Sequence, residues 1–386
     1  MRFVKSVRAK NLLSFGDPGI DFELQDLNVI IGPNSSGKSN LVSLFSLLRG
    51  ATASTAGKIT DVISTGGGAR EWLWKGAQDP VSAELGVAIA RPVGSGSLYY
   101  SLAFREEANR FLLLEERLDP GGRSRPFYHW KGEEHAHVLR NGKPMKEPVE
   151  PGRMSMSHRW IKSQYPELAY TSESLASIRI FQDWQFGWKS GARYSSYADM
   201  PSDFLAEDAG NLAIVIGDLI FHGLESEILR FVQLADPSAT GVKTLTQAGG
   251  IQLFVVERQL LTPAPAARLS KGVLQLLSLA AILLHPAPPK LICIEEPENG
   301  LHPDVLTDLA KLLMEASART QLIVTTHSEV LVDSLTSCPE TVVVCEKFRG
   351  ETSLKRLAPE EVRMWQDGGK SLGQVWSMGA IGGNRW

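Results

Sequence analysis

The sequence predicts an α/β fold in which short buried strands alternate with helices. Three apolar runs are typical of buried strands: 27–31 (LNVII), 290–294 (KLICI) and 321–325 (QLIVT). The first run leads through a glycine-rich turn into a helix over 40–48 (NLVSLFSLL), and the third also precedes a helix. Such alternation predicts a parallel or mixed sheet with helices on its faces.

The composition is that of a globular protein with a sizeable core. The chain has 386 residues, of which 43% are hydrophobic and 22% charged, and 40 Lys and Arg against 43 Asp and Glu leave a formal charge of −3. This charge does not point to nucleic acid as a partner. The N-terminus lacks the apolar core of a secretion signal, and the longest apolar stretch, 276–284, is too short to cross a bilayer. We therefore expect a cytoplasmic protein without a membrane partner.

The pattern changes twice in the middle of the chain. Residues 81–131 hold short aromatic and branched runs separated by Gly, Pro and charged residues, which predict an antiparallel meander. A hairpin with the turn Asn141-Gly142 is expected to close it. From 172 to 235 the apolar period is that of amphipathic helices, the first of them over 172–184 (SESLASIRIFQDW). Strand character returns at 251–256 (IQLFVV).

The turn after the first strand is a P-loop, Gly32-x-x-x-x-Gly37-Lys38-Ser39. Its backbone N–H groups, at the start of a helix, attract phosphate, and the two glycines let the backbone wrap it without a Cβ in the way. Lys38 is expected to reach the β and γ oxygens, and Ser39 to ligate Mg²⁺. The predicted phosphate-binding residues are Gly32, Pro33, Asn34, Ser35, Ser36, Gly37, Lys38, Ser39 and Asn40.

Three further segments carry polar groups beside apolar ones. Ser270 is suited to cap the apolar helix that follows it, and Gly272 lies in its first turn, a pattern that equally fits an ordinary core helix. Glu295 and Glu296 follow a buried strand, where two adjacent carboxylates are costly unless they meet a cation or a polarised water. His327 ends the third strand.

In this order the motifs GPNSSGKS, LSKG, LICIEE with PENGLHP, and TTHS resemble the ABC-class ATPase heads of RecF, SMC and OLD-type proteins. The chain is most similar to the stand-alone bacterial ATPases of that class, often described as AAA-family. The resemblance implies a P-loop NTPase head of ABC type, with an antiparallel β-subdomain and a helical lobe inserted between the Walker A and signature motifs. Only 59 residues follow His327, too few for a TOPRIM nuclease.

Five regions are expected on this basis. They are 1–80, the N-terminal half of the ATPase head; 81–150, the β-rich insertion; 151–250, the mostly helical lobe; 251–350, the C-terminal half of the head; and 351–386, a C-terminal extension.

The resemblance also implies residue roles. Lys38, Glu296 and His327 would be catalytic, with Glu296 as general base and His327 as the switch histidine at the γ-phosphate. Ser39 and Glu295 would hold Mg²⁺, although most relatives have Asp at the position of Glu295. The Gln that completes the Mg²⁺ shell stays unassigned among Gln78, Gln164, Gln182 and Gln185.

The same resemblance implies that Ser270 and Gly272 serve the nucleotide of a second head, so that ATP joins two protomers head-to-tail. The function predicted is an ATPase, with ATP and Mg²⁺ as cofactors, that gates a separate effector such as a nuclease or toxin-like chain in anti-phage defence or DNA maintenance. Two alternatives stay open: a RecF-type nucleic-acid clamp without an effector, and an ATP-binding switch with negligible hydrolysis.

Overall fold

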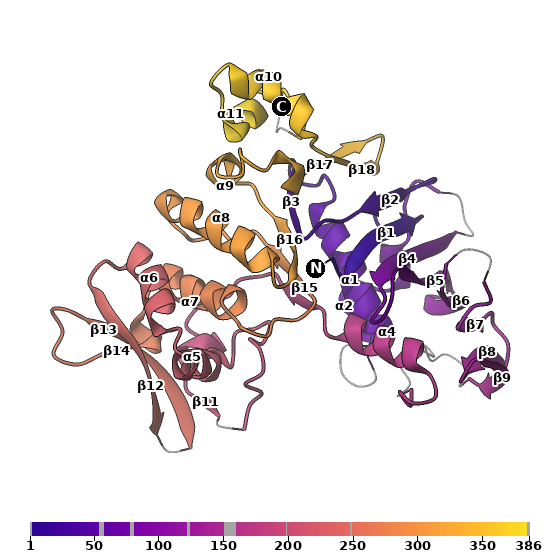
Figure 1. Cartoon of the computed structure of the whole chain (residues 1–386), viewed down its shortest axis with the longest axis horizontal. Helices are drawn as coiled ribbons and strands as arrows, with labels where there is room; N and C mark the ends of the chain where they lie inside the picture. Colours follow the sequence, from indigo (N-terminus) through magenta and orange to yellow (C-terminus); the bar gives the residue numbers. More distant parts are fainter. Residues whose placement is uncertain are drawn as a thin grey trace.

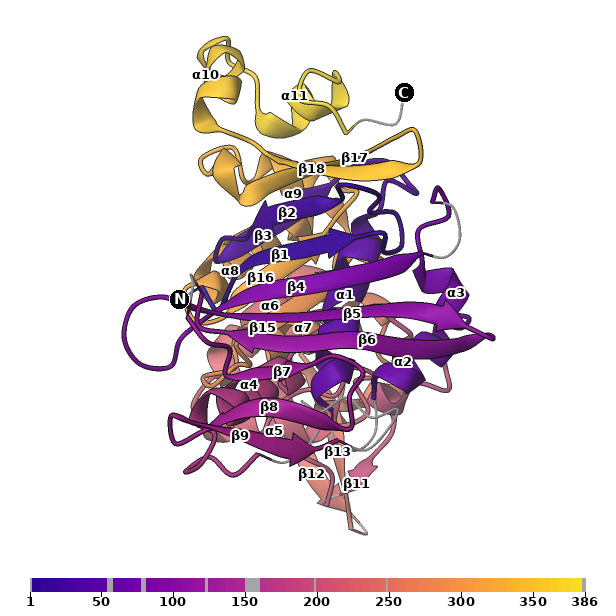
Figure 2. The same cartoon turned by 90° about the vertical axis from the view of Figure 1, so that its right-hand side faces the viewer.

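The computed structural model describes residues 2–53, 58–77, 81–121, 124–149, 160–197, 199–247 and 249–383. A central, mostly parallel sheet has a long antiparallel sheet on one side and a mixed helical and β lobe on the other (Figure 1). Figure 2 shows the antiparallel sheet face-on, with helix α1 (Lys38–Thr52) behind it.

The central sheet confirms the three predicted strands and places them side by side. Its first five strands run parallel, and the sixth returns antiparallel as a hairpin. Strands β3 and β16 are buried along their whole length, as expected of strands covered on both faces. The strand order is β10 (Arg179–Phe181), β15 (Leu291–Glu295), β16 (Gln321–Thr325), β3 (Leu27–Ile31), β17 (Val342–Phe348) and β18 (Glu351–Arg356).

The antiparallel sheet confirms the predicted meander and hairpin. Arg140 pairs with Lys143 across the Asn141-Gly142 turn, where both turn residues have positive φ. The N-terminal strand β1 pairs with β4, so the meander continues a sheet that begins at the N-terminus. The order is β2 (Ile20–Glu23), β1 (Val4–Lys10), β4 (Ser82–Ala90), β5 (Ser97–Glu107), β6 (Arg110–Asp119), β7 (Tyr128–Trp130), β8 (His135–Arg140) and β9 (Lys143–Pro148).

Two hydrophobic cores lie on opposite faces of the central sheet, because side chains alternate along each strand. Ile30 packs with α1 in the core shared with the antiparallel sheet, whereas Val29 and Ile31 belong to the second core. The first core also receives α2 (Ile59–Thr65), α3 (Ala69–Trp72) and α4 (Pro166–Ala176). The second is covered by α7 (Lys271–Leu283), α8 (Pro303–Ser317) and α9 (Glu329–Asp333).

One predicted helix is wrong. The helix expected over 172–184 ends at Ala176, and residues 179–181 form β10 instead. Ile180 and Phe181 are buried beside β15, so the open edge of the parallel sheet overrides the local helical period.

The lobe combines helices with a small sheet. Strand β13 pairs with three others, and α5 packs on β12 and β13. Its elements are η2 (Gly191–Arg193), β11 (Ser196–Tyr197), α5 (Leu212–Phe221), α6 (Glu225–Ala235), β12 (Ala239–Gln247), β13 (Gly250–Glu257), β14 (Ala264–Pro265) and η3 (Ala266–Arg268).

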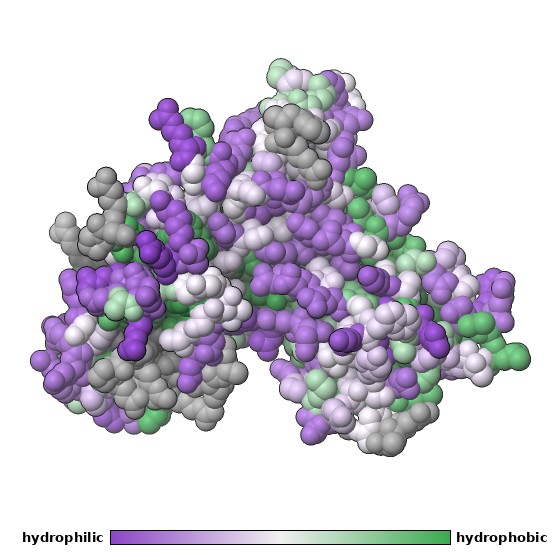
Figure 3. All heavy atoms as spheres, turned by 180° about the vertical axis from the view of Figure 1, so that it is seen from behind, coloured by the Kyte–Doolittle hydropathy of each residue, from purple (hydrophilic) through white to green (hydrophobic). Residues whose placement is uncertain are grey.

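The C-terminal segment packs on the head. Helix α11 (Leu372–Ser377) lies on α9, where Gly373 N donates to Asp333 Oδ1 at 3.0 Å and Ser377 Oγ to Glu329 Oε1 at 2.9 Å. The short helix η4 (Pro339–Thr341) and α10 (Pro359–Asp367) complete this end. No helix in the described part of the chain is long and apolar enough to span a membrane. From behind, the molecule is hollowed between the antiparallel-sheet side and the lobe, and the centre of this face is mostly hydrophilic (Figure 3).

Candidate nucleotide-binding site

Three loops meet at the carboxyl edge of the central sheet. The P-loop follows β3. Glu295 is the last residue of β15, Glu296 is the residue after it, and His327 comes two residues after β16. Because these strands are neighbours, segments about 260 to 300 positions apart in sequence come together here. Ser39 Oγ lies 3.4 Å from Glu295 Oε2, and His327 Nε2 lies 3.5 Å from Glu296 Oε1. The predicted catalytic set is therefore assembled in one place.

The P-loop has a shape that only glycine permits at two points. Gly32 and Gly37 have φ of +154° and +111°, and a Cβ would lie 2.1 Å from Cys345 O at the first and 2.2 Å from Thr352 Oγ1 at the second. Lys38 Nζ donates to Gly32 O at 2.9 Å and Pro33 O at 3.0 Å, which holds the loop closed around the amine.

The remaining P-loop side chains differ in exposure. Asn34, Ser35 and Ser39 are exposed, whereas the Ser36 hydroxyl is buried and has no hydrogen-bond partner among the described residues. Asn40 Nδ2 donates to Ser14 Oγ at 2.7 Å and ties the first turn of α1 to the β1–β2 loop. The exposed polar side chains of the loop and the N–H groups at the start of α1 are therefore suited to bind a phosphate.

Glu295 fits a divalent cation. Burial raises the pKa of its carboxyl; the Ser39 hydrogen bond opposes this rise, while Glu296 and Asp183 add to it. Its Oε1 atom is buried without a hydrogen-bond partner in the described structure. Together with the Ser39 hydroxyl, this oxygen suits Mg²⁺, which keeps water and phosphate oxygens for its other positions. Within the described residues no group of three or more His, Cys, Asp and Glu side chains could hold a metal.

Glu296 is oriented by several neighbours. Its φ of +44° is uncommon for a non-glycine residue, and its N–H donates to Thr325 O at 2.9 Å. Asn299 Nδ2 donates to Glu296 Oε2 at 2.7 Å, while His327 lies on the side of Oε1. A carboxylate held this way, with a partly exposed side chain, can accept a proton from a water in the loop.

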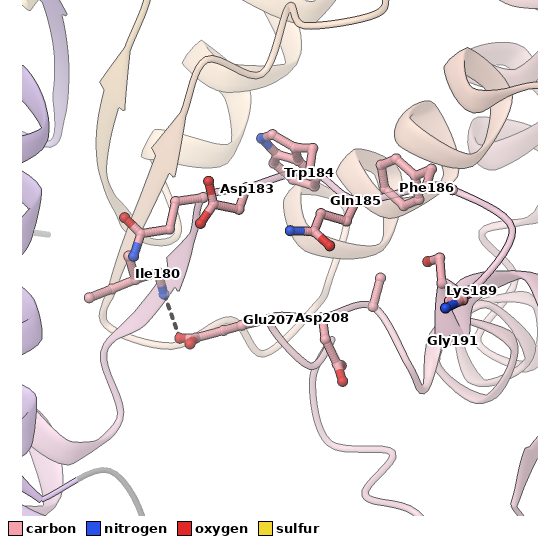
Figure 4. Close-up of a pocket in the computed structure, with 13 residues that line it drawn as sticks. Ile180, Asp183, Trp184, Gln185, Phe186, Lys189, Gly191, Glu207 and Asp208 are labelled. Atoms are coloured by element: carbon pink, nitrogen blue, oxygen red, sulfur yellow. Dashed lines mark hydrogen bonds between the residues drawn. The ribbon is translucent and has the colours of Figure 1, made fainter. Parts of the chain in front are cut away.

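The structure narrows the choice of glutamine. Gln182 and Gln185 follow β10, the neighbour of β15, and line a cavity of about 540 Å³ that Figure 4 shows between the 182–191 segment and Glu207–Asp208. Trp184 Nε1 donates to Glu295 O at 2.7 Å, which places this segment against the site. Gln164 lies beside the β8–β9 hairpin, where its carbonyl accepts from Asn141 N, and Gln78 lies outside the described residues.

Ser270 and Gly272 lie at the start of α7, beside the turn that follows Glu296. Ser270 is the N-cap of α7, as predicted, with its Oγ accepting from Val273 N at 3.2 Å, and its side chain is exposed. Gly272 packs near Gly300, whose carbonyl oxygen would lie 3.3 Å from an added Cβ. In the described structure neither residue hydrogen-bonds to the P-loop, Glu296 or His327.

Two participants were not assigned from the sequence. Asn299 holds the carboxylate of Glu296, and Glu298 Oε1 accepts from Thr326 Oγ1 at 2.6 Å and from His327 N at 2.7 Å. Burial raises the pKa of Glu298, and the two hydrogen bonds act in the opposite direction. The sequence offered one signal for Glu298: it is a third acidic residue, only two positions after the Glu295-Glu296 pair.

A second cavity, of about 480 Å³, adjoins the start of α1. It is lined by Ser14 and Asn40, by Trp74 and Lys75 after α3, and by Lys347 and Arg349 in and after β17, among others. It therefore combines an aromatic ring with cations beside the P-loop.

The family model for an "AAA domain, putative AbiEii toxin, Type IV TA system" matches residues 27–133 and 155–333. Over 46 residues the chain is 54% identical to the uncharacterized protein MJ1542 of Methanocaldococcus jannaschii, a match covering 12% of this chain and 6% of that protein.

The fold is similar to solved SMC heads. An Smc head bound to the C-winged helix domain of ScpA covers 93% of this chain and 99% of its own length, with TM-score 0.57 and 14% identity. A Pyrococcus furiosus Smc head with an extended coiled coil, bound to the C-terminal domain of ScpA, covers 96% and 100%, with TM-score 0.59 and 13% identity. A Pyrococcus yayanosii head with a coiled coil and joint covers 96% and 100%, with TM-score 0.57 and 10% identity.

The family model matches more than half of the chain, and its range includes the P-loop, Glu295, Glu296 and His327. The chain therefore belongs to this AAA family, and its fold is similar to that of solved SMC heads.

Proposed function

We propose that the chain binds ATP with Mg²⁺ and hydrolyses it at sites that a second copy of the chain completes. One observation carries this proposal: the predicted phosphate-facing groups converge on one sheet edge, while the start of α7 is exposed and, in the described structure, makes no hydrogen bond to them.

The P-loop would hold the triphosphate. Lys38 Nζ, now bound to two loop carbonyls, would turn its charge to the β and γ oxygens, and the N–H groups opening α1 would donate to the same phosphates. Ser39 and Glu295 would hold Mg²⁺, which offsets phosphate charge when bound.

We assign the base and ribose to the cavity beside Asn40. A nucleotide with its phosphates in the P-loop extends away from the start of α1, and this cavity opens there. Trp74 offers an aromatic face, and Lys347 and Arg349 offer cations for ribose and phosphate oxygens.

Hydrolysis requires a base and a group that meets the developing charge. Glu296 would accept a proton from the attacking water while the water oxygen bonds to the γ-phosphorus and ADP leaves. His327 Nε2, already near the Glu296 carboxylate, would donate a hydrogen bond to the γ-phosphate. The water-attack geometry depends on both side chains being held, which the contacts of Asn299 and Glu298 support.

A second copy would supply the remaining donors. The N-terminus of α7 carries Ser270 and the Gly272 N–H, and a helix N-terminus is suited to bind an anion. The Ser270 side chain is exposed. Two copies related by a twofold axis would each present this end to the other's γ-phosphate, so the interface would hold two nucleotides.

We further propose that closure of the two heads gates a separate effector chain. The family description refers to a toxin–antitoxin system, and two of the similar Smc heads are bound to a domain of another protein, ScpA. Both observations favour a partner protein over an isolated ATPase. A nuclease or toxin-like chain in anti-phage defence or DNA maintenance is the partner class this proposal names.

The test is the light-scattering mass of Glu296→Gln with and without Mg²⁺-ATP, alongside wild-type turnover. Blocked proton transfer should trap the closed form, so the mass should double with ATP and stay single with ADP. A mass unchanged by ATP would contradict ATP-driven dimerisation.

Two results would replace parts of the proposal. Wild-type turnover no faster than that of Glu296→Gln would indicate an ATP-binding switch. A closed dimer with salt-sensitive DNA affinity and no co-purifying chain would indicate a nucleic-acid clamp.

A further inference from the structure

The turn Pro297–Gly300 lies between three parts of the site. Asn299 bonds to the catalytic carboxylate of Glu296, and Glu298 bonds to the segment carrying His327. On the other side Gln275 of α7, which is buried, donates from Nε2 to Pro297 O at 3.0 Å. The turn therefore touches Glu296, the segment that carries His327, and helix α7.

Glu298 is the residue of this turn that contacts the switch segment most directly. One oxygen, Oε1, accepts both from Thr326 Oγ1 and from His327 N, and Oε2 is buried without a hydrogen-bond partner in the described chain. The buried carboxylate is therefore removed from water, and its two hydrogen bonds, to Thr326 and His327, offset part of that cost.

The backbone before His327 has a second anchor. Thr326 N donates to Ile30 O at 3.1 Å, which ties the end of β16 to β3, and the Thr326 hydroxyl also accepts from Ser328 N at 3.0 Å. Beyond Thr326, His327 N donates to Glu298 Oε1 at 2.7 Å, and the imidazole Nε2 lies 3.5 Å from Glu296 Oε1.

We propose that Glu298 is a positioning residue that holds His327 in register with Glu296, and that the turn carrying it links this pair to helix α7 through the bond from Gln275 to Pro297 O. Its contacts are with Thr326 and His327, so we assign it a role through His327. This inference rests on the proposed ATPase function, and its tests are chosen to separate the two.

Removing the carboxylate should lower turnover more than binding. Glu298→Ala should reduce kcat about 10²-fold, because a displacement near 1 Å at a reacting group has an effect of that order. KM for ATP should change by less than about threefold, since nucleotide binding does not involve this residue. Glu298→Gln, which keeps an acceptor oxygen in the same place, should recover most of the lost kcat. Glu315→Ala, on the exposed face of α8, is the matched control and should behave as wild type.

A double-variant comparison shows whether Glu298 acts through His327. If it does, Glu298→Ala combined with His327→Ala should have the same kcat as His327→Ala alone. If the wild type hydrolyses ATP, an equal kcat in Glu298→Ala, or full additivity in the double variant, would overturn the inference.

A second measurement does not need turnover. Among the eight histidines, the ring resonance of His327 in isotope-labelled protein should move in Glu298→Ala and stay in place in Glu315→Ala. An unmoved His327 resonance would overturn the positioning role even if wild type hydrolysed no ATP. If the His327 resonance moves in Glu298→Ala but the wild type hydrolyses no ATP, the positioning role stands and the proposed hydrolysis is wrong.

Discussion

The carboxyl edge of the central sheet and the start of helix α7 both present polar groups suited to a phosphate, but the first set is packed within the chain and the second is exposed. At the sheet edge the site residues follow buried strands, and Lys38, Glu295, Glu296 and His327 have neighbours within the chain. At α7, Ser270 caps its own helix and presents an exposed side chain. The difference teaches that the core of this chain positions one half of the proposed site, whereas the half at α7 stays exposed, where the proposed second copy would meet it.

The largest effect should come from breaking the sheet-edge half. Lys38→Ala removes the charge at the centre of the loop, so kcat/KM for ATP should fall by at least about 10²-fold. Retained binding of a fluorescent ATP analogue would contradict this assignment. The exposed Lys311→Ala on α8 provides a control that should bind normally.

Breaking the α7 half should have a different pattern. Ser270→Arg should leave ATP binding by one chain near wild type, but turnover should fall about 10²-fold because the partner's γ-phosphate loses its donors. Loss of the N-cap should cost about 1 kcal/mol of stability, which Ser270→Thr largely avoids. The measurement is ATP affinity and turnover on the same samples.

A mixture of the two damaged proteins sharpens the comparison. Lys38→Ala retains the α7 end and Ser270→Arg retains the P-loop, so their mixed dimer should contain one intact composite site. Turnover of the mixture should exceed that of either variant alone. A mixture no more active than its parts would mean that the α7 end does not work across a dimer.

The smallest effect concerns pH and the lobe. His285, just after α7, packs edge-on against Phe204, its Nδ1 accepts from Ala287 N, and its Nε2 is buried without a hydrogen-bond partner among the described residues. Burial lowers its pKa below the ordinary 6.5. Neutral His285 therefore contributes stability that is present above pH 6.5 and is lost as the pH falls from there toward the lowered pKa, because the unfolded chain takes up the proton first.

Calorimetry between pH 8 and pH 5 checks this. The fall in Tm over this range should be smaller for His285→Leu than for wild type, while the exposed His135→Leu should follow wild type. An equal slope for all three would show that His285 does not contribute.

Much of the site could be predicted because its signals are local. The P-loop, the Glu295-Glu296 pair and the Ser270 cap are each set by a few adjacent residues, and the structure has each on its expected element. The prediction of a helix over 172–184 was wrong because β10 forms by pairing with the edge of β15. The local spacing of apolar residues carries no information about that distant strand.

The sequence by itself determined the α/β class, the phosphate loop and the residues that carry charge, because these depend on spacing along the chain. Tertiary structure alone decided which distant groups meet. The order β15-β16-β3 brings Ser39 to Glu295 and His327 to Glu296, and the Pro297–Gly300 turn joins them to α7. Such contacts follow from which strands pair and which helices cover them, and pairing between distant segments is decided only when the whole core is buried at once.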